Sequence, residues 1–174
     1  MGSIASISVG VVAGLWLAAM RSTLEEMTGM LVMIPPFMGM RGNISGSFSS
    51  RISTELHRGS LKPAYKLSGN TNWDIFSFFI IGTMASLMVG IFAYATCLLL
   101  NFPNAGIVKL TLTSFIAGVI SNLVMIVLTF FSTIFFFRRG IDPDTVMGPY
   151  ITSIGDIVSI ITLFMAARMV ISGW

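Results

Sequence analysis

The chain has 174 residues, of which 55% are hydrophobic and only 10% are charged, and its mean hydropathy is +0.89. This composition excludes an ordinary soluble domain and indicates a polytopic helical membrane protein with little mass outside the bilayer. The apolar residues run continuously instead of alternating, which excludes a transmembrane β-barrel. The formal net charge of +3 comes from loops and favours orientation in a membrane over nucleic-acid binding.

Four apolar stretches are long enough to cross a bilayer as helices, a crossing that takes about 20 residues. We expect membrane-spanning helices over about 4–20, 75–100, 107–137 and 145–172. The last follows Asp142-Pro143-Asp144, a pattern typical of a helix N-cap with proline in the first turn. The single cysteine, Cys97, lies inside an apolar run and is expected to pack there.

A further span is expected over about 27–50, although its apolar part ends near Met40. Pro35-Pro36 interrupts it, and small and polar residues follow over 41–50. To cross the membrane the helix must continue through that segment, which cannot face lipid and must pack against protein or line water. A re-entrant hairpin is the alternative. We therefore predict an all-α fold with five spans, and treat 1–174 as one transmembrane domain without a cytosolic regulatory domain.

Lysine and arginine gather in the loops after the second and fourth spans, at Arg51, Arg58, Lys62, Lys66, Arg138 and Arg139. Basic loops stay on the cytoplasmic side, so the N-terminus is expected in the cytoplasm and the C-terminus outside. This bias argues against an antiparallel, dual-topology dimer. The prediction is a multi-pass integral protein of the plasma membrane, surrounded by lipid.

Asp156 is the one acidic residue deep inside a stretch that the bilayer must cover. A carboxylate there is costly and by default indicates a functional site; the alternative is a structural aspartate bonded to a neighbouring helix. Pro149, Thr152, Ser153, Asp156 and Ser159 fall on one face of a helix. Hydroxyl, carbonyl and carboxylate oxygens are the ligands that magnesium, calcium and manganese prefer.

One carboxylate neutralises only half the charge of a divalent cation. Two copies related by a two-fold axis along the membrane normal would bring two Asp156 side chains to one axis. The charge arithmetic therefore points to an oligomer.

Two segments resemble the MgtE family and its eukaryotic solute-carrier relatives. Pro35-Pro36-Phe37-Met38-Gly39-Met40-Arg41-Gly42-Asn43, followed by Ser50-Arg51-Ile52-Ser53-Thr54, is similar to the family's second membrane helix. Asp142-Pro143 and the segment from Gly148 to Ile157 are similar to its fifth helix, in which proline and Thr-Ser precede the aspartate of the ion site.

The resemblance implies a homodimeric magnesium channel whose pore, on the dimer axis, is lined by the second and fifth helices. It places hydrated magnesium between paired Asp156 side chains, with the Thr152 carbonyl nearby and Asn43 and Gly42 on the pore side. The expected metal-binding set is thus Asp156, Thr152, Ser153 and Asn43. Magnesium or another divalent cation is expected as the transported ion, and neither a cofactor nor a catalytic residue is expected. Bacterial members also carry cytosolic regulatory domains, which we do not expect in a chain that starts at its first span.

Three other functions compete with a channel. A cation exchanger would use the same ligands. A non-conducting scaffold or assembly subunit would carry no flux and would tolerate a neutral residue in place of Asp156. An intramembrane phosphotransferase or hydrolase needs several acidic or nucleophile–base groups in one site, and Asp156 has no intramembrane histidine or lysine beside it in the sequence.

Overall fold

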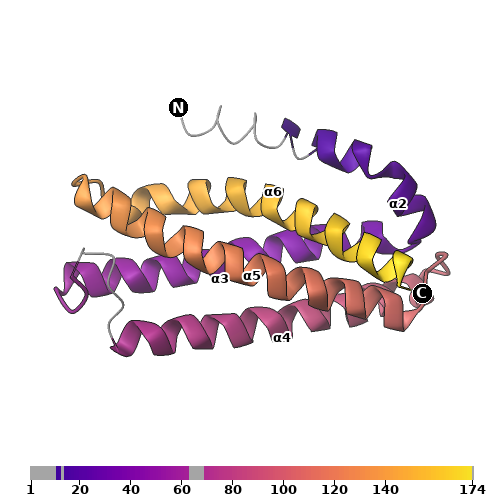
Figure 1. Cartoon of the computed structure of the whole chain (residues 1–174), viewed down its shortest axis with the longest axis horizontal. Coiled ribbons are helices and arrows are strands. Elements are labelled where there is room, and N and C mark those ends of the chain that lie inside the picture. The colour runs from indigo at the N-terminus through magenta and orange to yellow at the C-terminus, as the bar shows by residue number, and fades with distance from the viewer. Residues whose placement is uncertain (1–10, 13, 63–68, 174) are drawn as a thin grey trace.

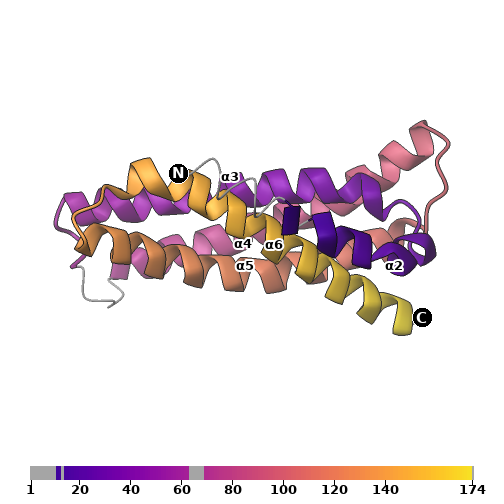
Figure 2. The same cartoon turned by 90° about the horizontal axis from the view of Figure 1, so that it is seen from above.

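The computed structural model of the chain describes residues 11–12, 14–62 and 69–173, and within these ranges the regular structure is entirely helical. The helices are α2 (Arg21–Glu26), α3 (Met30–His57), α4 (Gly69–Leu99), α5 (Ile107–Arg138) and α6 (Pro143–Ser172), and residues 11–12 and 14–19 are helical as well. The four long helices lie side by side: α3 and α5 contact each other in the middle, with α6 on one side and α4 on the other (Figures 1 and 2). The predicted all-α class is confirmed.

Helix α3 is continuous over 28 residues and passes through Pro35 and Pro36 without a break. At about 1.5 Å per residue it is roughly 40 Å long, enough to cross a bilayer. It begins at Met30, after Gly29 adopts a left-handed conformation (φ 90°), and it ends at His57. The expected continuation of the helix past Met40 is confirmed, and the re-entrant hairpin is wrong.

The contact between α4 and α5 is built on small side chains. Gly82, Ser86 and Gly90 are spaced four residues apart on α4 and meet the α5 residues Ser114, Gly118 and Asn122. The two backbones are so close that a Cβ at Gly90 would lie 2.6 Å from the Cα of Thr111. Small residues allow this close approach, which supplies van der Waals contact where lipid removes the hydrophobic drive for helices to associate.

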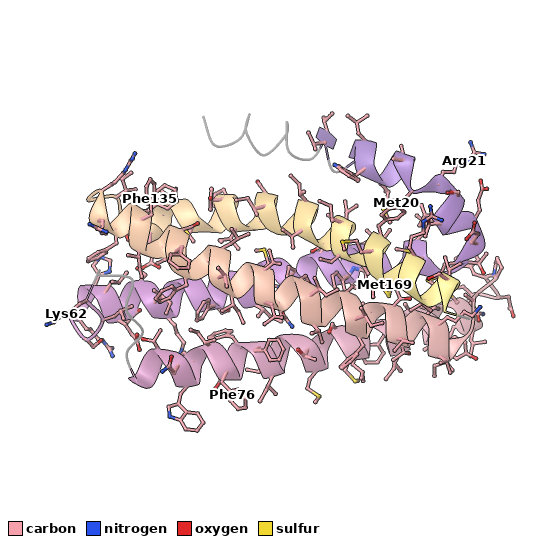
Figure 3. All side chains as sticks on the ribbon, viewed as in Figure 1. Met20, Arg21, Lys62, Phe76, Phe135 and Met169 are labelled. Atoms are coloured by element: carbon pink, nitrogen blue, oxygen red, sulfur yellow. The ribbon has the colours of Figure 1, made fainter. Side chains whose placement is uncertain are left out.

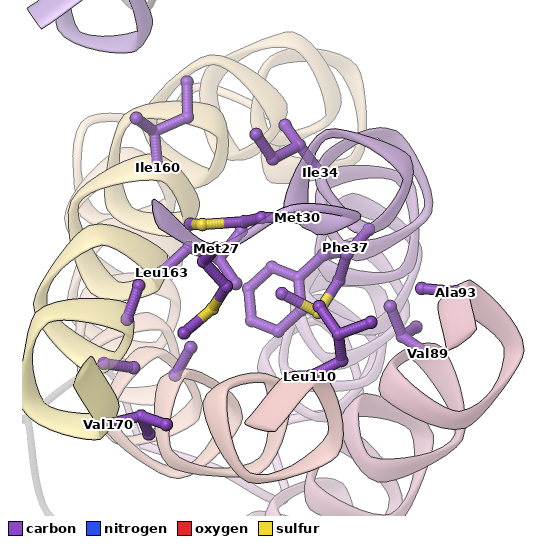
Figure 4. Packing of buried hydrophobic residues seen from close by; sticks show 14 of the residues in the cluster. Met27, Met30, Ile34, Phe37, Val89, Ala93, Leu110, Ile160, Leu163 and Val170 are labelled. Carbon is purple, nitrogen blue, oxygen red and sulfur yellow. The ribbon is translucent and has the colours of Figure 1, made fainter. Parts of the chain in front are cut away.

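An apolar core fills the other interfaces toward one end of the bundle. Met27, Met30 and Phe37 lie at its centre, with Leu110 of α5 and Leu163 of α6 around them (Figure 4). Methionine is flexible enough to fill the irregular space between helices. Cys97 is fully buried, as expected from its apolar surroundings.

Large apolar side chains cover the outer surface of α4 and α5. Phe76 and Phe135 point away from the bundle, as does Met169 of α6 (Figure 3). Thr71–Leu99, Ile107–Arg138 and Pro143–Ser172 are each long and apolar enough to span a membrane. The chain is therefore a multi-pass membrane protein. The expected first span is described only from residue 11 onward, so the five-span count stays a prediction.

Candidate functional site

Helices α3 and α6 run antiparallel, and three contacts define their register. Near the C-terminal end of α3, Ser50 and Ser53 both donate hydrogen bonds to the carboxylate of Asp144, each 3.1 Å long. Near the middle, a Cβ at Gly42 would lie 3.7 Å from the Thr152 hydroxyl. The predicted site residues of the two helices are thus brought to the same part of the bundle.

The outer face of α3 is small and polar where the outer face of α4 is large and apolar. Gly39, Asn43 and Ser47 are exposed at intervals of four residues, and Ser47 donates to the Asn43 carbonyl (2.9 Å). The expected site residue Asn43 therefore lies on this open face. Gly39 has nothing within 4 Å of where a Cβ would be, so the face is also open in space.

Helix α6 continues this surface beside α3. Gly148 and Thr152 are exposed, and the Thr152 hydroxyl donates to the Gly148 carbonyl (2.9 Å), which leaves its oxygen lone pairs available to a cation. Ser153 and Asp156 are half-buried at its edge. We define the polar face as Gly39, Asn43 and Ser47 of α3 with Gly148, Thr152 and Asp156 of α6.

The predicted stripe is not uniformly exposed along α6. At Ser159 it is fully buried, and the hydroxyl has no hydrogen-bond partner among the described residues. Ser159 shares a helix face with Thr152 and Asp156, as predicted from its spacing, but it lies about two turns beyond Thr152, next to Ile160 of the apolar core. The face is therefore exposed toward one end of α6 and buried further along.

Asp156 makes no hydrogen bond or ion pair with any described residue, unlike the structural aspartate of the alternative interpretation. Its carboxylate oxygens are therefore not committed to a neighbouring helix in one chain. Within the described ranges, no three His, Cys, Asp or Glu side chains come together as a metal cluster. A single chain thus provides hard oxygen ligands around one carboxylate.

Arg41 is the residue that the sequence interpretation missed. It is only 1% exposed and donates from Nη1 to the Asn122 side chain of α5. Asn122 in turn donates to the Thr83 hydroxyl of α4 (3.2 Å), so its side chain links α5 to both α3 and α4. The signal was present in the sequence, because a helix that continues past Met40 carries Arg41 into the middle of the bundle.

These features define a class: a multi-pass helical membrane protein with a polar face on α3 and α6 and a carboxylate at the middle of α6. The sequence profile of MgtE, described as a divalent cation transporter, matches residues 34–166, well over half of the chain. The chain therefore belongs to the MgtE family. The match contains both α3 and α6 residues of the polar face.

The individual proteins that match this chain share about a quarter of its residues in the matched region. Solute carrier family 41 member 2 of Homo sapiens and of Mus musculus are each 24% identical over 154 residues, which is 80% of this chain and 25% of those proteins. Solute carrier family 41 member 3 of Rattus norvegicus is 24% identical over 143 residues, 78% of this chain and 30% of that protein. The chain thus spans about a quarter of the length of these relatives.

Proposed function

We propose that this chain moves hard divalent cations, magnesium foremost, across a membrane along the polar face of α3 and α6. The observation that carries the proposal is the polar face itself. Gly39, Asn43 and Ser47 of α3 and Thr152 of α6 are exposed, and α3 packs among the three helices that are long and apolar enough to span a membrane. Lipid cannot satisfy such groups, so this face is expected to line water or meet another protein surface.

In a homodimer with the pore on its two-fold axis, the polar face would both line water and meet the same face of the second copy. The polar faces of two copies would enclose a path between them, and each copy would contribute one Asp156. Two carboxylates offset the charge of one divalent cation, and the cation offsets the repulsion between them. The expected ligands are Asp156 carboxylates, with Thr152, Ser153 and Asn43 oxygens toward the waters of the ion, because magnesium gives up its water reluctantly.

The family supports transport over enzymatic function, since its description is that of a divalent cation transporter. A cation exchanger with the same ligands is the second candidate. Membership of a transporter family also weighs against a non-conducting scaffold. We further propose five spans per chain in the plasma membrane, with a cytoplasmic N-terminus and an external C-terminus.

Flux of magnesium into liposomes that hold a magnesium-sensitive dye tests the proposal. Asp156→Asn keeps the size of the side chain but removes two charges from each dimer, so we expect most of the flux to be lost from a folded protein. Asp156→Glu keeps the charge and should retain part of the flux with altered selectivity. Asp74→Asn is the matched control, because Asp74 lies on α4, which contributes no residue to the polar face, and pairs with Arg51 (2.7 Å).

The outcomes separate the candidates. Wild-type flux in Asp156→Asn would contradict the ion site. A structural role of Asp156 would produce the reverse pattern, in which asparagine is tolerated and the larger glutamate disrupts packing. Size-exclusion profiles of the variants should show the same oligomer as the wild type. Flux that requires a counter-ion gradient would assign the protein to the exchangers.

A further inference from the structure

A buried positive charge lies at the middle of the bundle. The guanidinium of Arg41 donates to Asn122 and lies 5.1 Å from the centroid of the Phe37 ring. Its Nε and Nη2 atoms are buried and have no hydrogen-bond partner among the described residues. An arginine in this position is expensive in a membrane, and neutral asparagine does not cancel its charge.

Arg41 and Asp156 lie at the same level of the bundle on neighbouring helices. The Arg41 Cγ atom lies 3.7 Å from where a Cβ at Gly155 would be, and Gly155 directly precedes Asp156. The two charges are nevertheless not paired, because no ion pair at 4 Å or less joins Arg41 to Asp156 in the described part of the chain. Asn122 binds the guanidinium on the α5 side, while Asp156 stands half-buried at the polar face.

A fixed positive charge beside an ion-binding carboxylate must act on the ion. Packed helices lie about 10 Å apart. Over that distance, at an effective dielectric constant of about 20, a unit charge changes the affinity for a divalent cation by roughly tenfold to hundredfold or more. Conduction requires that an ion bind strongly enough to enter and weakly enough to leave. A buried guanidinium at this level lowers the affinity of the site for the cation and so favours its release.

We propose that Arg41 is an affinity-determining residue for the ion site. Its charge, held away from Asp156 by Asn122, weakens cation binding at Asp156 so that the ion leaves the site instead of remaining bound. Asn122 is a positioning residue in this arrangement, since it acts through Arg41. The proposal rests on the proposed function, because it assumes that the cation binds at Asp156.

Two substitutions lower the net charge at this level by the same amount but differ in their effect on packing. Arg41→Gln removes the positive charge and also a contact between helices. Asn122→Asp keeps the shape of Asn122 and gives Arg41 a carboxylate partner in place. If the charge governs the site, both variants should bind a divalent cation about tenfold more tightly or better than the wild type. Arg41→Lys keeps the charge and should bind with nearly the wild-type affinity.

Equilibrium binding of Mn²⁺ to the purified full chain, followed by electron paramagnetic resonance, measures these affinities. A merely structural Arg41 predicts no tightening in Asn122→Asp, and that result would overturn the proposal even if Arg41→Gln failed to fold. Tightening in Arg41→Lys as large as in Arg41→Gln would overturn it too. Asp156→Asn is measured alongside: if it binds Mn²⁺ like the wild type, the proposed ion site fails. If it loses binding while Arg41→Gln and Asn122→Asp match the wild type, only the role of Arg41 fails.

Discussion

Gly42 of α3 lies against Thr152 of α6, where a Cβ at Gly42 would be 3.7 Å from the threonine Oγ1 and 3.9 Å from its Cγ2. Both distances are ordinary van der Waals contacts. A methyl group therefore fits between the helices, but anything longer must turn out over the polar face. This contact makes Gly42 a direct test of whether that face is the ion path.

We expect Gly42→Ala to conduct much like the wild type and Gly42→Leu to lose most of its flux, because the longer side chain would cover the Thr152 oxygen with hydrocarbon. Magnesium uptake by liposomes measures both. A leucine at Gly14, which has nothing within 4 Å of its Cβ position and belongs to neither α3 nor α6, is the control. Full conduction by Gly42→Leu would place the path elsewhere.

Gly90→Ala should destabilise the bundle. Its Cβ would lie 2.6 Å from the Cα of Thr111, and a backbone atom cannot swing aside, so α4 and α5 would have to separate. Overpacking of this kind costs about 1–3 kcal/mol. Gly39→Ala is the matched control, since it has open space around it and gains up to about 1 kcal/mol of helix propensity. Unfolding of the two proteins in mixed detergent, followed by tryptophan fluorescence, gives the difference; equal stabilities would mean that α4 and α5 are further apart.

Asp144 ties the start of α6 to α3 through Ser50 and Ser53. Asp144→Asn removes the charge that strengthens both bonds and that favours the N-terminal end of α6, so we expect a loss of about 1 kcal/mol in unfolding free energy. Asp142→Asn at the N-cap of α6 is the control, because asparagine caps helices as well as aspartate does. The same unfolding assay compares them. If both variants lost the same unfolding free energy, the effect of Asp144 would come from the N-terminus of α6 and not from its bonds to α3.

Much of the fold was predictable because continuous apolar runs define helices. The spans expected over 75–100, 107–137 and 145–172 correspond to α4, α5 and α6, with the predicted N-cap at Asp142. The helix expected to end near residue 50 continues to His57, because Ile52 and Leu56 pack into a second apolar cluster. That cluster joins residues that are far apart in the chain, so it cannot be predicted from the local sequence around residue 50.

The site was predictable only in part. Asn43 and Thr152 are exposed while Ser159 is buried, a difference that helical spacing does not give because it depends on how α6 packs. The helix that continues past Met40 already implied that Arg41 is buried, but its hydrogen-bond partner Asn122 lies 81 residues further along the chain and could not be inferred from the local sequence. Helical periodicity places residues on a face, but which face is covered is decided by the neighbouring helices.

Topology can be tested at the two ends of the bundle. Lys62 and Arg21 lie at opposite ends (Figure 3), and the turn between α5 and α6 is at the Lys62 end (Figure 1). Single cysteines at Ser60 and Ser172, both exposed, should label from opposite sides of the membrane in a Cys97→Ser background. The positive-inside rule predicts that Ser60 labels from the cytoplasmic side. Labelling of both positions from one side would contradict the five-span arrangement.

Cobalt hexammine should block magnesium flux. Magnesium dehydrates reluctantly, so a site made of oxygens on an open polar face is expected to bind it through retained waters. Cobalt hexammine resembles the hydrated ion in size and octahedral shape, carries a higher positive charge, and does not readily give up its ligands, so it should bind at the Asp156 level and stay there. Block should weaken in Asp156→Glu, whose longer side chain alters the space between the two carboxylates. Robust magnesium flux without block would mean that the ion loses water at the site, and that Asp156 contacts it directly.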